Sequence, residues 1–266
     1  MSVGHYENFP VASLLLPAPL RAPVAVIYRF ARSADDFADE GDDPQEKRLE
    51  NLNGFRLELQ RISSRENPKS PLFLDVARIV RDHDLPVQLF RDLLDAFSQD
   101  VTKKRYADFG EVLDYCRRSA NPVGRLLLHL FKRTSESNLK RSDAICTSLQ
   151  LINFWQDVAL DWAKGRVYLP QDEMQRYAVT ERHIADGRCD EAWRALMRFQ
   201  CVRAREMMLE GRPLTEGLPG RVAFEIKVTV TGGLRILEKL AASGYDMFRH
   251  RPTLRWHDWP LLLWRA

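Results

Sequence analysis

Residues 149–170 read LQLINFWQDVALDWAKGRVYLP and place two aspartates in a run that is otherwise apolar and aromatic. Helical spacing puts Gln150, Asn153, Asp157, Asp161 and Lys164 on one face, while nearly all other positions are apolar. Such a helix is buried, and an ionised carboxylate in a dry core is very costly. The polar face must therefore meet arginines of neighbouring helices or, as we favour, a divalent cation with an anionic ligand.

A second acidic row lies in residues 24–43, VAVIYRFARSADDFADEGDD. On a helix, one stripe would carry Tyr28, Arg32, Asp35 or Asp36, and Asp39. The acids fall at the C-terminal end, where the helix dipole disfavours negative charge. The row is either a solvated helix end or half of a cation site. We predict that the two rows face each other across a cavity.

Helical signals dominate the rest of the chain. Prolines 44, 71, 86 and 122 stand at first-turn positions, and each opens a segment with apolar residues at helical spacing. Further helices are expected at about 22–39, 108–119, 140–164, 190–210 and 221–243. No stretch shows sustained period-two alternation, and no repeat or linker is visible. We predict one all-α domain over residues 1–266, with roughly eight to ten helices.

Charge, cysteines and short motifs exclude several classes. The net charge is +3 with both signs well mixed, which argues against nucleic-acid binding. The four cysteines form no CxxC pair, so we expect reduced core residues of a cytoplasmic protein. The apolar runs are too short to span a membrane. No GxxxxGK[ST] or GxGxxG motif occurs, so a bound phosphate would be held by metal and side chains.

Magnesium suits the two acidic rows, because it takes one or two carboxylates together with waters and substrate phosphates. The expected metal ligands are Asp35, Asp36, Asp39, Asn153, Asp157 and Asp161. Basic side chains nearby, from Arg32, Lys164 and Arg166, would complete a diphosphate site, with Tyr168 as a hydroxyl donor.

Three segments together resemble, in order, the signatures of the squalene/phytoene synthase family. They are YRFARSADDFADE (28–40), DVTKKRYADFGEVLDYCRRSANPVG (100–124) and the stretch at 149–170. The resemblance covers roughly residues 5–250. It implies a helical bundle of the isoprenoid synthase type with a central apolar cavity, a prenyl diphosphate substrate and two or three Mg²⁺ ions. The expected catalytic residues are Asp35, Asp39, Asp157, Asp161, Asn153 and Tyr168, and the expected substrate-binding residues are Tyr28, Arg32, Gln150, Lys164, Arg166 and Arg105.

Two departures are similar to the hydroxysqualene synthase branch of bacterial hopanoid biosynthesis. The segment HYENFPVASLLLP (5–17) replaces the opening of the condensing members, and Gln156 stands where those members usually have an arginine. This branch takes presqualene diphosphate from its synthase, releases pyrophosphate, captures water and hands hydroxysqualene to a reductase. The alternatives are a synthase that joins two prenyl diphosphates, a non-catalytic helical assembly factor and a helical nucleotide pyrophosphohydrolase.

Two further expectations concern the pocket wall and the C-terminal end. A carbocation needs dry, aromatic walls, and the candidates are Phe30, Phe37, Phe131, Phe154 and the segment 126–130. Residues 245–266, YDMFRHRPTLRWHDWPLLLWRA, have the composition of an anchor on the inner face of a membrane. The alternative is a segment docked on the domain. Within it, Arg251 is a further candidate for the diphosphate.

Overall fold

Three helices in the first half of the chain begin at a proline or directly after one, as the sequence predicts. The computed structural model describes residues 16–266, and the expected family opening at 5–17 lies almost entirely outside them. Pro44 and Pro86 cap α2 (Gln45–Ser63) and α4 (Val87–Thr102), and Pro71 is the first residue of α3 (Pro71–His83). The missing N–H of proline costs nothing at these positions.

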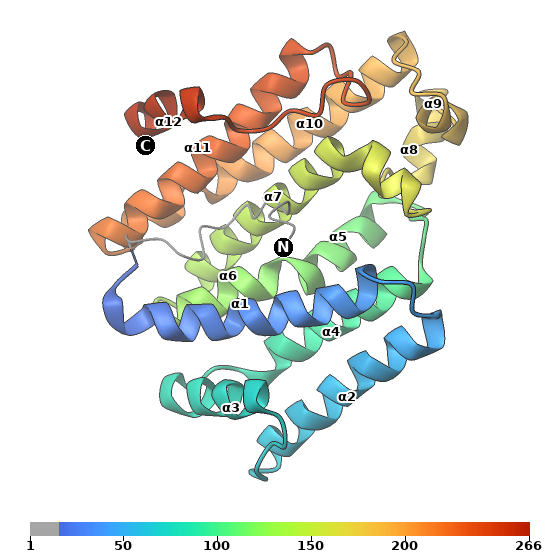
Figure 1. The fold of residues 1–266 in the computed structure, drawn as a ribbon. Coiled ribbons are helices and arrows are strands. Elements are labelled where there is room, and N and C mark those ends of the chain that lie inside the picture. Colours follow the sequence, from blue (N-terminus) through green and yellow to red (C-terminus); the bar gives the residue numbers. More distant parts are fainter. Residues whose placement is uncertain (1–15) are drawn as a thin grey trace.

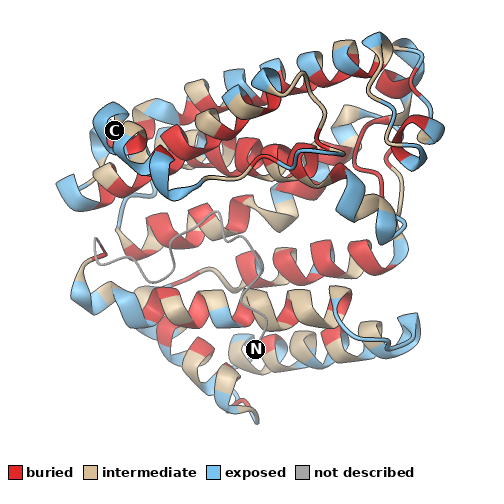
Figure 2. Cartoon of the chain, turned by 45° about the horizontal axis from the view of Figure 1, so that its top comes forward, coloured by how far each residue is buried: buried red, intermediate tan, exposed pale blue. Residues whose placement is uncertain are grey.

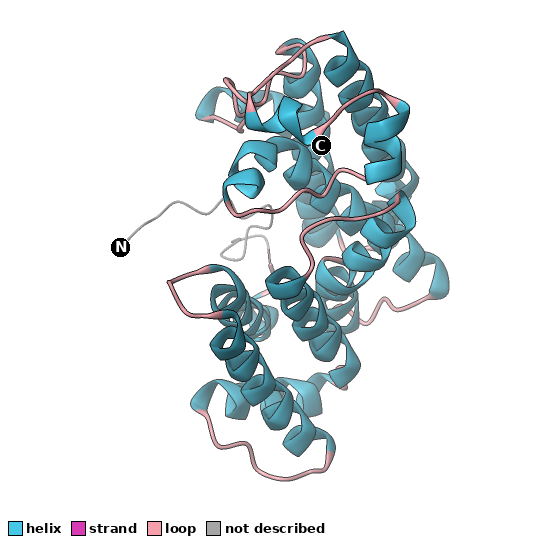
Figure 3. Ribbon diagram, turned by 90° about the vertical axis from the view of Figure 1, so that its right-hand side faces the viewer, coloured by secondary structure: helices cyan, strands magenta, loops and turns pink. Residues whose placement is uncertain are grey.

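The described residues contain helices and loops but no strand (Figures 1 and 3). This confirms the predicted all-α class. The other helices are α1 (Ala18–Asp39), α5 (Phe109–Ser119), α6 (Asn121–Leu130), α7 (Glu136–Ala163), α8 (Gln171–Arg176), α9 (Glu181–Ala185), α10 (Glu191–Gly211), α11 (Gly220–Ala242) and α12 (Trp259–Arg265), with 3₁₀ turns η1 (Arg212–Gly217) and η2 (Trp256–Asp258).

The described helices outnumber the eight to ten that were expected. The extra ones are α8, α9 and α12, which have six, five and seven residues. A helix of two turns or fewer shows too little hydrophobic periodicity to be recognised from its sequence. None of the helices in residues 16–266 is both long and apolar enough to cross a bilayer.

Two hydrophobic cores lie on either side of the cavity described below. The α1–α4 core contains the buried faces of α1 to α4 and part of α6, with Phe30, Phe73 and Phe90 packed edge to face. The α7–α11 core surrounds α7 and includes Trp155 and Trp193, both fully buried. Figure 2 shows buried residues running through the helices of both parts. The four cysteines are free, and three of them are buried, as expected for core thiols.

Helices α7 and α10 approach each other closely at Gly211. A β-carbon at this position would lie 2.5 Å from Ile145 Cγ1 and 2.7 Å from the Arg141 carbonyl oxygen. The second neighbour is backbone, so it cannot move aside without shifting α7. Glycine therefore sets the spacing between α10 and the helix that carries the second acidic row.

Candidate active site

The two acidic rows open onto one cavity of about 600 Å³. Helix α1 contributes Asp35 and Asp39, and α7 contributes Asp157 and Asp161. Both rows come from the ends of long helices that each bury an apolar face in a different core. The cavity is also lined by Arg32, Glu40, Asp100, Tyr115, Gln150, Asn153, Phe154, Leu160, Ala163, Lys164, Arg166, Tyr168 and Arg251. The structure thus brings the two predicted stripes together.

Asp39 is the point where the two rows meet. Its Oδ2 atom lies 2.8 Å from Lys164 Nζ and 2.7 Å from Arg166 Nη2, on the far side of the cavity. Burial alone would raise the pKa of Asp39, but the hydrogen bonds from Arg166 and Lys164 hold it below its ordinary value. Asp39 is therefore ionised and already neutralised by side chains of the α7 end.

Asp35 and Asp161 have the opposite electrostatic situation. Burial, together with repulsion from Asp39, raises the pKa of Asp35 to about 7. Burial also raises the pKa of Asp161 to about 7, against the influence of Arg166 and with that of Asp157. Carboxylates that ionise this reluctantly are stabilised by additional positive charge. The cavity therefore favours an added cation near these carboxylates.

Asp100 on α4 is a site residue that the sequence reasoning missed. Its side chain is buried and accepts hydrogen bonds from Tyr115 (2.6 Å) and Tyr168 (2.8 Å), while Arg166 Nη1 lies 3.7 Å away. Burial raises the pKa of Asp100 to about 6, although Arg166 and the tyrosines act in the other direction. The ring of Tyr168 stacks on Phe154, with centroids 3.7 Å apart.

The sequence did contain a signal for Asp100. Residues 89–101 bury one continuous face, and Asp100 is the single acid on it. The argument applied to Asp157, that a carboxylate among buried apolar residues needs a partner, applies here equally. The hydroxyl of Tyr168 was expected to donate to a phosphate, but in the structure it donates to Asp100.

Arg251 reaches the cavity from the segment between α11 and α12. Its Nε lies 2.5 Å from Asp157 Oδ1, and its Nη2 lies 3.1 Å from Oδ2. The neighbouring residue is held by Gln156, whose Nε2 donates to the Pro252 carbonyl oxygen at 2.7 Å. Gln156 is buried on α7, so this bond fixes the backbone beside Arg251. Gln156 thus helps to position Arg251.

Three expected binding residues do not line the cavity. Arg105 instead makes a two-point contact with Glu181 (2.5 and 2.9 Å) and donates to the Gly165 carbonyl, so it braces loops around α7. Asp36 pairs with Arg32 at 2.7 Å, since it is turned about 100° from Asp35 around α1. Tyr28 is half-buried two turns before Asp35.

Most of the expected aromatic walls are core residues. Phe30 is fully buried among Phe73 and Phe90, and Phe37 packs on Phe55. Phe131 and the segment 126–130 also pack against the cores and are absent from the lining. Only Phe154 lines the cavity. The helical spacing of these aromatic residues was predicted correctly, but the same spacing is typical of residues that pack in a core.

The donor set fits magnesium held jointly with a phosphate ligand. Within residues 16–266, no three acidic, histidine or cysteine side chains converge closely enough to form a complete metal site by themselves. Asp35 and Asp161 nevertheless offer hard oxygen ligands at a position that disfavours negative charge. Magnesium uses few protein carboxylates and completes its octahedron with water and phosphate oxygens. The residues present therefore suit an ion that arrives with a diphosphate.

Comparison with known proteins gives consistent matches over most of the chain. The model of the squalene/phytoene synthase family matches residues 3–259. A hydroxysqualene synthase from Rhodopseudomonas palustris is 34% identical over 236 residues, which cover 88% of this chain and 79% of that protein. A phytoene synthase from Mycobacterium tuberculosis is 31% identical over 220 residues, which cover 82% and 72%. The crystal structure of squalene synthase HpnC from Alicyclobacillus acidocaldarius is similar with a TM-score of 0.83 and 33% identity, over 91% of this chain and 90% of that one.

Proposed function

Because the chain belongs to the squalene/phytoene synthase family, we propose that it converts presqualene diphosphate and water into hydroxysqualene and pyrophosphate. The family match confirms the resemblance to this family, and hydroxysqualene synthases are among the relatives above 30% identity. The observation that carries the proposal is the meeting of acidic and basic side chains from α1, α4, α7 and the Arg251 segment around one cavity. This arrangement suits a substrate with a diphosphate and an apolar remainder.

Basic residues at three positions around the cavity would bind the diphosphate together. Arg32 stands on α1, Lys164 and Arg166 stand at the C-terminal end of α7, and Arg251 stands on the segment between α11 and α12. All four are neutralised by aspartate or glutamate in the present structure. A diphosphate offers them stronger, multiply charged acceptors. Magnesium would be held by Asp35, Asp39, Asp157, Asp161 and Asn153, and would supply Lewis-acid neutralisation of the leaving group.

The reaction then follows from charge and solvent exclusion. The bond between carbon and the diphosphate oxygen breaks, and its electron pair leaves with pyrophosphate, whose charge Lys164 and Arg166 stabilise. The rearranged carbocation faces the stacked rings of Phe154 and Tyr168, because aromatic faces favour cations. Water adds to the cation, a carbon–oxygen bond forms, and one proton is released. Gln150 and Asn153 lie on the cavity face of α7 and are the proposed groups that orient this water.

A condensing synthase is the second candidate, and the phytoene synthase relatives favour it. Such an enzyme would join two prenyl diphosphates in the same kind of cavity. The two are separated by their substrates: incubation with presqualene diphosphate and Mg²⁺ should yield hydroxysqualene. Formation of squalene- or phytoene-type products from simple prenyl diphosphates alone would reject the first reading. An assembly factor would turn over none of them.

The assignment of the acidic rows is tested by Asp157→Asn and Asp161→Asn. Each removes a charge but keeps the side-chain volume, and we expect turnover to fall about a hundredfold or more. Asp82→Asn, an exposed carboxylate on α3, is the matched control and should keep full activity. Circular dichroism should remain helical for all three variants. Full activity in both α7 variants would overturn the assignment.

The surroundings of the reaction are also part of the proposal. The substrate must come from an enzyme that joins two prenyl diphosphates into a cyclopropyl intermediate, and a reductase would consume the alcohol. Both compounds are largely hydrocarbon and partition into lipid. We therefore place the protein in the cytoplasm, in contact with the inner face of the membrane.

A further inference from the structure

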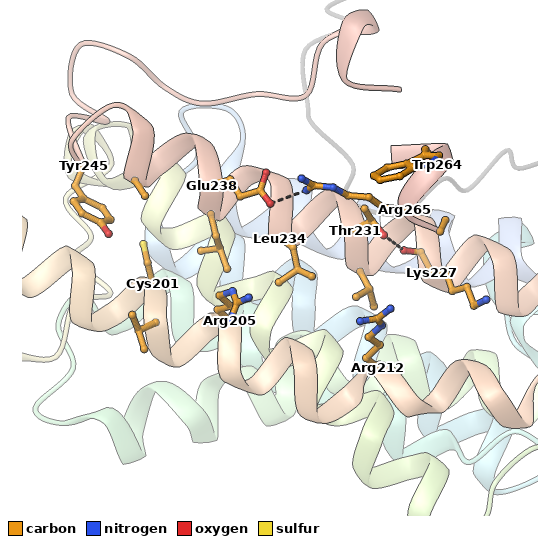
Figure 4. A pocket seen from close by; sticks show the side chains of 15 residues that line it. Cys201, Arg205, Arg212, Lys227, Thr231, Leu234, Glu238, Tyr245, Trp264 and Arg265 are labelled. Atoms are coloured by element: carbon orange, nitrogen blue, oxygen red, sulfur yellow. Dashed lines mark hydrogen bonds and ion pairs between the residues drawn. The ribbon is translucent and has the colours of Figure 1, made fainter. Parts of the chain in front are cut away.

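A second cavity lies between α10, α11 and α12 and shares no lining residue with the acidic site. It has a volume of about 550 Å³ and opens along the surface (Figure 4). Its floor is apolar and is formed by Val202, Val230, Leu234, Leu237 and Ala241. Nothing in the proposed reaction uses this groove.

The rim of the groove is basic. Arg205 and Arg212 on the α10 side face Lys227 on α11, and all three are exposed (Figure 4). None of these three makes an ion pair with another residue of the described part, 16–266. The single acid of the lining, Glu238, is already paired with Arg265 at 2.7 Å. The rim therefore carries an excess of positive charge that no neighbouring side chain neutralises.

Large apolar side chains are exposed on residues 256–264, of which Trp264 lines the groove. Trp256 is 82% exposed and Trp264 83%, while Trp259 and Leu263 are each about half exposed. Four of the eight exposed large hydrophobic residues among the described ones thus lie on residues 256–264, and a fifth, Val202 of α10, lines the groove. Such a concentration on one short segment is unusual for a surface that faces only water.

The segment that carries the exposed tryptophans is anchored to the rest of the protein. Leu262 is 1% exposed and attaches α12 to the body, and Asp258 is equally buried. The Asp258 carboxylate binds both Lys239 and Arg235 of α11, the latter at 3.0 Å. The exposure of the indoles is thus a consequence of how the segment is anchored.

We propose that this face, the α10–α12 groove with its tryptophans, docks on the surface of an anionic phospholipid bilayer. Indole rings favour the headgroup region, where the apolar body and the N–H are both satisfied. Arginine and lysine at the rim would contact lipid phosphates, and the apolar floor would accept the upper part of a chain. A second copy of this chain fits less well, because it would oppose like charges across the interface.

Vesicle sedimentation tests the proposal with the full chain and no substrate. The protein should bind phosphatidylglycerol vesicles, bind phosphatidylcholine vesicles more weakly, and lose affinity as salt is added. Arg205→Gln with Arg212→Gln should weaken binding to the anionic vesicles about twenty-five-fold, since each cation near such a surface contributes about fivefold. Lys69→Gln with Arg182→Gln, two exposed bases elsewhere, is the charge-matched control and should bind like the parent.

A second pair of variants tests the apolar contribution. Trp256→Ala with Trp264→Ala should abolish the binding that remains at high salt, while Leu57→Ala with Leu74→Ala, exposed on α2 and α3, should not. Turnover of detergent-dispersed substrate should be equal in all variants. Failure to bind anionic vesicles, or equal binding by the tryptophan variant, would overturn the proposal. Displacement of the protein from the vesicles by soluble inorganic phosphate would overturn it in favour of a free anion. A dimer in sedimentation velocity that the variants lose, without any vesicle binding by the parent, would overturn it in favour of a second copy.

Discussion

Replacement of Arg251 by glutamine separates a structural role of this arginine from a role in binding the substrate. In the structure its guanidinium makes two contacts with the carboxylate of Asp157. Both side chains keep substantial exposure, 33% for Arg251 and 27% for Asp157. A pair so accessible to water contributes only about 0.5–1 kcal/mol to folding. The melting temperature of the variant should therefore fall by no more than about 2–4 °C.

The expected effect on activity is much larger. If Arg251 binds the diphosphate, its loss removes a charge-assisted contact from a group that gains charge as the bond breaks. Removal of one such donor typically lowers turnover by about 10²–10³-fold. Arg251→Lys keeps the charge but loses the two-point geometry, so its activity should lie between that of the parent and that of Arg251→Gln.

The assay measures hydroxysqualene formation from presqualene diphosphate together with inhibition by pyrophosphate. Arg251→Gln should lose both turnover and pyrophosphate affinity, and Arg78→Gln on α3 serves as a control for the removal of one surface arginine. A variant whose activity falls only in proportion to its folded fraction, or whose pyrophosphate affinity is unchanged, would refute the reasoning.

Three other expectations concern stability. Because Lys239 and neighbouring donors hold the pKa of Asp258 well below its usual range, despite the cost of burial, Asp258→Asn should lose about 1.5–3 kcal/mol at pH 7. That difference from the parent should shrink as the pH falls below about 4, because the carboxylate of the unfolded parent takes up a proton there while that of the folded parent stays ionised to lower pH. Gly211→Ala should destabilise by about 1–3 kcal/mol, since its methyl group meets Ile145 and the α7 backbone, and chemical denaturation will measure this. Asp100 has a raised pKa, so its charge weakens the metal-free fold. The unfolding free energy of the parent relative to Asp100→Asn should drop between about pH 4 and pH 6, by at most about 3 kcal/mol, and a flat difference would contradict the burial argument.

The sequence was most informative where one pattern had one physical solution. The stripe on α7 could be predicted because this helix is apolar except for one narrow polar face, and that face must point to a cavity or to charged partners. Gln150, Asn153, Asp157 and Asp161 indeed share the cavity. The long helices were found for the same reason.

The remaining errors arose where partners come from distant parts of the chain. Arg105 and Arg166 both belong to basic, signature-like segments, yet one binds Glu181 and the other Asp39. Spacing along the chain does not distinguish these outcomes, because the partner is fixed by tertiary packing. Phe30 and Phe154 likewise have the same helical periodicity, although Phe30 is enclosed in the α1–α4 core and Phe154, part of the α7–α11 core, also lines the cavity.

The position of the cavity between two separately packed cores has a mechanical consequence. Asp35 and Asp39 stand on α1, whose apolar face packs in the α1–α4 core, while Asp157 and Asp161 stand on α7, which packs in the α7–α11 core. The separation of the two acidic rows thus depends on how the two cores pack on each other, and the ion pairs of Asp39 with Lys164 and Arg166 link them across the cavity. A multivalent anion that displaces these ion pairs would itself link the two cores. Repacking Phe73 or Leu59, which lie in the α1–α4 core and do not line the cavity, would therefore alter how the enzyme binds its ligand.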